Sequence, residues 1–182
     1  MRTYFFIFFT IFSISVKGQN TLDAEIITKS NDTLNKKIKI IIDPIGFVET
    51  RNITLILKVK IFDSSGSKQT LHSREISKIS FVDYKGEKRI YISNEKNELA
   101  ELMHSGKIRW TREYSTHPYD GSTIIFEVWT NEFGVMEDTY MFRNAKKALK
   151  RMVSAKPELI DLIDNTKFNK ETIKNVLIKY DE

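Results

Sequence analysis

The sequence predicts an α+β fold, in which a curved, mainly antiparallel β-sheet is followed by a C-terminal segment of about three helices. Apolar and polar residues alternate from about 24 to 130, which is typical of strands with one buried face. From about 138 to 181 the apolar residues recur every three or four positions, which is typical of amphipathic helices. The chain has 182 residues, 41% of them hydrophobic, which is enough for a single such domain over 19–182.

Residues 1–18 have the pattern of a secretory signal peptide. Arg2 precedes an apolar stretch from Tyr4 to Val16, and small or polar residues follow. A stretch of about 13 residues is shorter than the roughly 20 that a membrane-spanning helix needs. We therefore expect cleavage before Gln19 and export to the periplasm, the cell envelope or the medium.

The strands are predicted from the alternation and from the turns between them. Ala24–Thr28 and Thr33–Ile42 flank Ser30-Asn31-Asp32, a sequence that suits a hairpin turn. Asn52–Ile61 is the most regular strand. Further strands are expected at Glu75–Val82, with Ile79 and Phe81 on its buried side, and at Lys88–Ser93, Lys107–Tyr114 and Thr123–Trp129.

Helices are predicted from apolar spacing and from capping residues. Leu99, Leu102 and Met103 lie three and four residues apart between Asn97 and Gly106, so we expect a short helix there. The first long helix begins after Asp138. Its apolar face is expected to contain Met141, Phe142, Ala145, Ala148, Leu149 and Met152. Pro157 suits the first turn of a second helix, and Asn169 suits the cap of a third.

Composition and charge exclude several classes of protein. The chain has no Cys, which excludes a disulfide scaffold, a thiolate metal site and a cysteine hydrolase. Lys and Arg number 29 against 24 Asp and Glu, and residues 1–18 hold two of these bases and no acid, so the remainder has a net charge of +3. Nucleic-acid binders concentrate a larger excess on one surface, so we expect no nucleic-acid partner.

The sequence contains no recognisable catalytic or metal-binding motif. His72, His104 and His117 lie at long, irregular spacings that do not suit a zinc site. The glycines are isolated and do not form a phosphate-binding loop. Asp161 and Asp164 lie three residues apart, which is typical of the solvated edge of a helix. We predict no catalytic residue, no metal site and no cofactor, and we favour a non-enzymatic protein.

An aromatic segment is the main candidate for a ligand-binding site. Both tryptophans and several other aromatic residues lie between 110 and 133, interleaved with Arg, His and Asp. Aromatic rings beside hydrogen-bonding groups suit a sugar, a peptide or a protein partner. We predict ligand binding by Trp110, Tyr114, His117 and Tyr119. The alternative is that the aromatic residues of the strands belong to the core.

Three functional hypotheses remain open. The first is a binding or structural module of the cell envelope, whose partner is a protein or an envelope polymer. The second is an exported hydrolase that acts on glycan or peptide through a site scattered over the strands. The third is membrane-surface contact through five cations of 143–151, although small Ala145 and Ala148 on the opposite side favour packing on a sheet.

Several stretches resemble a group of exported proteins from Bacteroidetes-type bacteria. They cover most of the region after Gln19 and read IITKSNDTLNKKIKI, SREISKISFVD, GKIRWTREY, AKPELIDLIDN and NKETIKNVLIKY. The resemblance implies export and the α+β architecture. None of these stretches is a catalytic signature, so the resemblance implies no functional residue.

Overall fold

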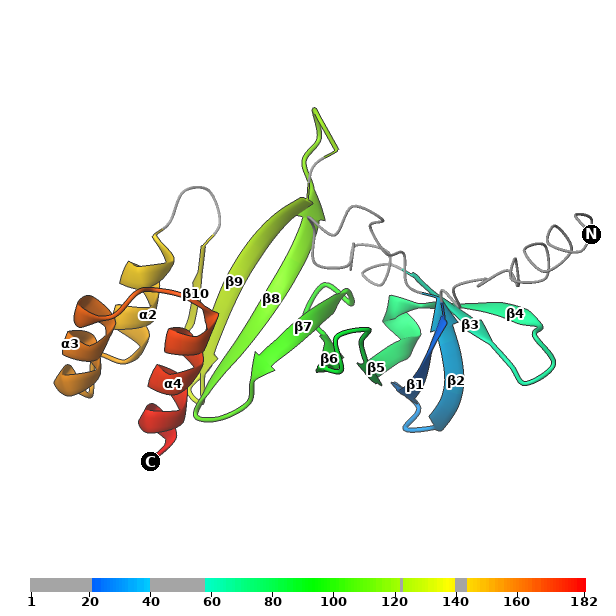
Figure 1. Cartoon of the computed structure of the whole chain (residues 1–182), viewed down its shortest axis with the longest axis horizontal. Helices are drawn as coiled ribbons and strands as arrows, with labels where there is room; N and C mark the ends of the chain where they lie inside the picture. The colour runs from blue at the N-terminus through cyan, green and yellow to red at the C-terminus, as the bar shows by residue number, and fades with distance from the viewer. Residues whose placement is uncertain (1–20, 40–57, 122, 140–143) are drawn as a thin grey trace, which may run out of the picture.

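The computed structural model describes residues 21–39, 58–121, 123–139 and 144–182. Within them, ten strands form one curved antiparallel sheet and three α-helices follow it, so the α+β prediction is confirmed. In Figure 1 the helices lie at one end of the sheet and strands β1 to β4 lie at the other. The predicted signal peptide lies outside the described residues.

The strands pair in a simple order. The first five are β1 (Thr21–Thr28), β2 (Thr33–Lys39), β3 (Lys58–Phe62), β4 (Lys68–His72) and β5 (Ile76–Val82). The others are β6 (Lys88–Ser93), β7 (Leu99–His104), β8 (Ile108–Thr116), β9 (Thr123–Asn131) and β10 (Met136–Asp138). From β5 to β10, each strand pairs with the next along the chain. The exception to chain order is β1, which lies between β2 and β5.

Two separate hydrophobic clusters hold this sheet together. The first extends from β1 to Tyr114 of β8 and is centred on fully buried isoleucines such as Ile26, Ile38 and Ile79. The second lies where Trp110 and Trp129 of β8 and β9 meet the helices. Because successive side chains of a strand point to opposite faces, the chain neighbours of these buried strand residues point to the other face of the sheet.

Several strand predictions are confirmed. The first hairpin turns at Asn31, whose φ of 66° is the left-handed conformation that Asn tolerates. Ile79 and Phe81 are buried, as expected. Ile76 is buried as well, because the register between β1 and β5 shifts at Thr28. Of the predicted strand 52–61, the described part begins at Lys58, and its alternate residues are buried as predicted.

The predicted short helix over 97–106 is wrong, because Leu99–His104 forms strand β7. Asn97 has a φ of 60° and closes the tight turn from β6, where the Oδ1 of Asn94 accepts backbone N–H bonds from Lys96 and Glu98. Leu99, Ala100 and Glu101 of β7 are all buried, so both faces of the strand are covered at its start. Because one of these buried residues is charged and burial does not alternate, the sequence shows no strand period here.

The three helices are α2 (Ala145–Met152), α3 (Pro157–Asn165) and α4 (Lys170–Asp181). Pro157 opens α3 and the Asn169 side chain caps α4 through the N–H of Thr172, as predicted. The first helix begins later than expected, after Asn144, and the short strand β10 occupies 136–138. Ala148, Leu149 and Met152 of its predicted apolar face are buried. Met141, Phe142 and Arg143 lie outside the described residues.

The end of α4 is fastened to the turn between β7 and β8. The carboxylate of Asp181 lies 2.8 Å from His104 Nε2 and accepts the backbone N–H of Lys107 at 2.8 Å. The Nζ of Lys107 donates to the carbonyl oxygen of Asp181 at 2.7 Å. A Cβ atom on Gly106 would stand 1.9 Å from the same carboxylate, so only glycine allows this close approach.

We therefore predict that Gly106→Ala lowers the free energy of unfolding by about 1 to 3 kcal/mol, because its methyl group must displace the Asp181 carboxylate. Urea unfolding of Gly106→Ala, Asp181→Ala and the double variant measures the coupling between the two sites. In the Asp181→Ala background the alanine at 106 should cost much less. An equal cost in both backgrounds would contradict the steric explanation.

Candidate functional site

A groove crosses the face of the sheet opposite to the helices, and we call it the β6–β10 groove. Its volume is about 520 Å³, and its lining comes from β6, β7, β8, β9, β10 and the turn between β6 and β7. Thr111 and Val128, which are cross-strand neighbours, belong to this lining. Their chain neighbours Trp110 and Trp129 point the other way, into the cluster with the helices.

The floor of the groove is largely apolar. Ile92, Ala100, Phe126 and Val128 line it, and Ala100 and Val128 are only 1% and 8% exposed. Met136 of β10 extends the apolar lining toward the edge of the sheet, where it is more exposed. Since Ala100 and Val128 are already buried, a ligand here would cover mainly Ile92, Phe126 and Met136 and would remove their apolar surface from water.

Charged side chains surround this floor, and most of them are acidic. The lining contains Glu95, Glu98, Glu113, Asp138, Lys96 and Arg109. Four carboxylates against two cations give the groove a net charge of −2. The Nδ2 of Asn94 donates to Glu113 Oε1 at 3.1 Å, which orients that carboxylate beside the β6–β7 turn.

The loop between β8 and β9 extends from the end of the groove that Ser115 lines. Ser115 lines the groove, and two residues later the chain enters the loop, which projects past the end of the sheet in Figure 1. His117 Nδ1 lies 3.0 Å from Asp120 Oδ1, and the ring centroids of His117 and Tyr119 are 5.7 Å apart. Tyr119 is 93% exposed, so its ring is available to a partner.

The four predicted ligand-binding residues fall into two groups. Trp110 and Tyr114 are buried in the sheet, where the Nε1 of Trp110 donates to Glu127 Oε2 at 2.6 Å and the Tyr114 hydroxyl donates to Glu101. Tyr114 also borders the groove. His117 and Tyr119 lie on the exposed loop beyond it. Trp110 and Tyr114 thus take the core position that was the alternative, while His117 and Tyr119 remain candidates for binding.

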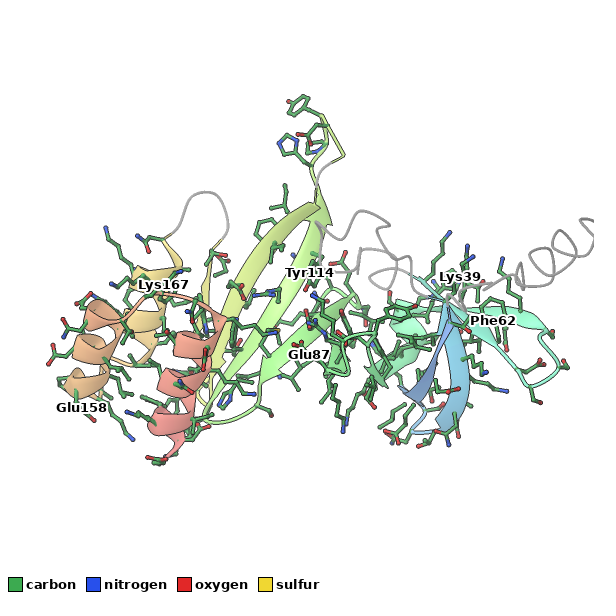
Figure 2. All side chains as sticks on the ribbon, viewed as in Figure 1. Lys39, Phe62, Glu87, Tyr114, Glu158 and Lys167 are labelled. Carbon is green, nitrogen blue, oxygen red and sulfur yellow. The ribbon has the colours of Figure 1, made fainter. Side chains whose placement is uncertain are left out.

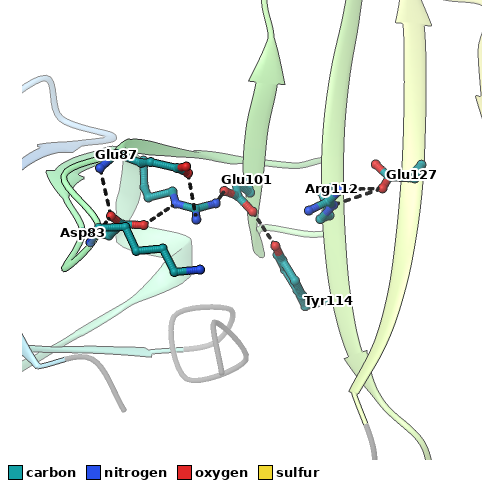
Figure 3. Close-up of polar contacts among 8 residues, drawn as sticks. Asp83, Glu87, Glu101, Arg112, Tyr114 and Glu127 are labelled. Atoms are coloured by element: carbon teal, nitrogen blue, oxygen red, sulfur yellow. Dashed lines mark hydrogen bonds and ion pairs between the residues drawn. The ribbon is translucent and has the colours of Figure 1, made fainter. Parts of the chain in front are cut away.

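A buried polar network that no sequence pattern indicated joins β6, β7 and β8. Arg89 of β6 donates from Nε to Asp83 at 2.9 Å and from Nη1 to Glu101 at 2.6 Å, and all three side chains are buried. Glu87 contacts the same guanidinium at 3.2 Å. Figure 3 shows Asp83, Glu87 and Glu101 gathered in this way, with the Tyr114 hydroxyl directed at Glu101.

The contacts of this network stabilise the charged forms of Asp83 and Arg89. Burial raises the pKa of Asp83, but the bonds from Arg89 and from the backbone N–H groups of Glu87 and Lys85 outweigh it, so the pKa lies below its ordinary value. Burial lowers the pKa of Arg89, but its bonds to Glu101 and Asp83 have the larger effect, so the pKa lies above its ordinary value. The network is therefore a structural link across β6, β7 and β8.

A second ion pair lies beside it, between β8 and β9. Both the Nε and the Nη2 of Arg112 donate to Glu127 Oε1, at 3.0 Å and 2.8 Å, and Figure 3 shows the two residues directed toward one another. Burial lowers the pKa of Arg112, and the charge of Glu127 more than compensates. This pair also receives the indole of Trp110, so it couples the polar network to the helical cluster.

Cations of the predicted basic face are partly neutralised by neighbouring acids. Lys146 and Lys150 lie 3.2 Å and 2.5 Å from the carboxylate of Asp164 on α3. Arg151 pairs with Glu137 of β10 at 2.6 Å. Asp164, which the sequence placed at a solvated edge, thus bridges α2 and α3. The hydrogen bonds from Lys150 and Lys146 lower its pKa.

Another hollow of about 580 Å³ lies over β1, β2 and the end of β3. Its lining is mostly exposed and polar, including Asp23, Glu25 and Lys37. It offers little buried apolar surface to a ligand, since Ala24 and Phe62 are the only hydrophobic residues in the described part of its lining. Of the two, the β6–β10 groove has the better floor for binding.

The three histidines lie at separate places in the fold, because His72 ends β4, His104 ends β7 and His117 follows β8. Figure 2 draws the described side chains on the ribbon, with Tyr114 near the middle of the sheet and Glu158 on the helices. Among the described residues, no group of three or more His, Asp or Glu is placed to hold a metal ion. In the same residues, no helix has the length and apolar character needed to cross a membrane.

Comparison with known proteins adds no relative to these observations. No protein-family model, no curated protein and no solved structure matches the chain.

Proposed function

We propose that this protein is an exported, non-enzymatic binding module of the cell envelope, and that its ligand lies in the β6–β10 groove. The observation that carries this proposal is the groove itself, which joins an apolar floor to a charged rim on the face opposite to the helices. The signal-peptide pattern of residues 1–18 supports export. The exposed loop with His117 and Tyr119 adds an aromatic edge at one end.

A binding role suits the side chains of the groove better than a hydrolytic one. Glu113 is engaged by Asn94, and the described residues of the lining include no histidine. Three carboxylates lie at or beside the β6–β7 turn and the fourth, Asp138, lies on β10, so they border the groove from two sides. Such spacing suits contacts along an extended ligand. Membrane-surface contact through α2 has less support, because three of its cations pair with Asp164 and Glu137.

Thermal unfolding of residues 19–182 against a panel of peptides, glycans and wall fragments tests the proposal. A ligand at 100 times its Kd stabilises the folded state by about 2.7 kcal/mol, which should raise Tm by roughly 5 to 10 °C. We predict that Thr130→Trp abolishes this shift, because Thr130 lines the groove and an indole there would fill it.

Thr70→Trp is the matched control, since Thr70 is exposed on β4 at the far edge of the sheet. It should leave the shift unchanged. A ligand whose Tm shift is the same in Thr130→Trp as in the parent protein would place binding elsewhere and refute the assignment. The absence of a shift with every member of the panel would count against a small-ligand site.

A further inference from the structure

The dimensions of the β6–β10 groove suit an extended chain. Its lining comes from five adjacent strands. With neighbouring strands about 4.8 Å apart, five strands span about 19 Å, which is the length of roughly six residues in extended conformation. An extended peptide also turns alternate side chains in opposite directions, so every second residue can contact a continuous floor.

The charges of the groove indicate which peptide would fit. The chain as a whole is basic, with a formal net charge of +5, whereas the groove lining carries −2. The acidity of the groove is therefore a local property. Glu95 and Glu98 stand together on the β6–β7 turn, with Glu113 of β8 held nearby through Asn94. Phosphates and carboxylates of anionic polymers would be repelled at this end.

We propose that the ligand of the β6–β10 groove is an extended, cationic peptide segment in which Lys or Arg alternates with apolar residues. The inference rests on the proposed function of the groove. The apolar side chains contact the accessible apolar lining, Ile92, Phe126 and Met136, and the long basic side chains reach the carboxylates of the rim. Three of the four carboxylates gather at the β6–β7 turn and Asp138 lies across the groove on β10, so cations at both ends of the segment would each meet a carboxylate.

Fluorescence anisotropy with labelled hexapeptides tests the proposal on residues 19–182. The probes are alternating Val-Lys, Val-Glu and Val-Ser sequences of equal length, so that only the charge differs. We expect Val-Lys to bind at least about 10-fold more tightly than the other two. Its affinity should fall several-fold between about 50 and 500 mM NaCl, because salt screens exposed charges.

Paired variants separate the rim from the rest of the surface. In Glu95→Gln/Glu98→Gln we expect Val-Lys binding to weaken by about 2- to 5-fold for each carboxylate removed. Glu158→Gln/Glu171→Gln is the matched control, since both residues are exposed on the helices of the opposite face. It removes the same charge and should leave the affinity unchanged.

The outcomes distinguish this inference from the proposed function. Equal binding of the three peptides, if Thr130→Trp abolishes it, would overturn the preference for cations and leave the groove as the site. Binding of a glycan but of no peptide, again sensitive to Thr130→Trp, would have the same meaning. Equal weakening of Val-Lys binding in both Glu-to-Gln pairs would also overturn the inference. The loss would then follow from the net charge of the protein and not from carboxylates of the groove.

Discussion

Replacing Arg89 with alanine is expected to lower the free energy of unfolding by about 3 to 5 kcal/mol. The guanidinium is only 6% exposed, and it holds the buried carboxylates of Asp83 and Glu101. Removing it leaves two acidic groups in the interior without their counter-charge. Urea unfolding measures the loss, and fluorescence can report it because both tryptophans are fully buried.

The loss should depend on pH. The pKa of Asp83 is depressed in the folded protein, so its contribution to stability is present above about pH 4 and disappears as the pH falls through the folded-state pKa. The Arg89→Ala variant lacks the main cause of this depression. The difference in stability between the two proteins should therefore be largest near pH 7 and smaller near pH 3.

Arg151→Ala is the control for this experiment. Arg151 makes two bonds of 2.6 Å to Glu137, but its side chain is 53% exposed. Water screens such a pair, so we expect only a small fraction of the loss seen for Arg89. Similar losses in the two variants would mean that the buried network contributes no more than a surface pair.

Replacing Trp110 with alanine is expected to cost about 3 to 5 kcal/mol of unfolding free energy. The indole is fully buried between the sheet and the helices, so its removal opens a cavity. It also leaves Glu127 without the Nε1–H bond of 2.6 Å. Denaturant unfolding followed by the fluorescence of Trp129 gives the magnitude.

Trp110→Phe separates the two contributions. It keeps most of the apolar contact and removes the hydrogen bond, so its cost should be about 1 to 3 kcal/mol. Because Trp110 faces away from the β6–β10 groove, Trp110→Phe should also retain the affinity for the groove ligand. A loss of binding in this folded variant would restore Trp110 as a ligand-contacting residue.

The features that the sequence predicted correctly are those that depend on near neighbours. A turn at Asn31, a proline at the start of α3 and a capping asparagine at 169 act over a few residues. The alternation of Val59 and Ile61 on β3 and the apolar stripe of α2 are equally local. These signals were sufficient for the α+β class and for most of the elements.

The prediction failed for β7 because the partners of its central residue are distant along the chain. Glu101 is bound by Arg89, 12 residues before it, and by Tyr114, 13 residues after it. When these partners are unknown, a glutamate is expected to be exposed, and the spacing of Leu99, Leu102 and Met103 then fits a helix. The pairing across β6, β7 and β8 is what permits a carboxylate in the interior.

The candidate site likewise combines features that the sequence predicted with features that depend on tertiary contacts. From its sequence this protein was predictable as an α+β chain with a strand-rich first part, a helical end and an aromatic segment near 110–133. Only the tertiary structure decided that Trp110 and Tyr114 are buried, that His117 and Tyr119 remain on a loop, and that five strands together form a groove. The reason is physical, since helix and strand periods record local geometry, whereas burial and a shared surface arise from contacts between residues distant in sequence.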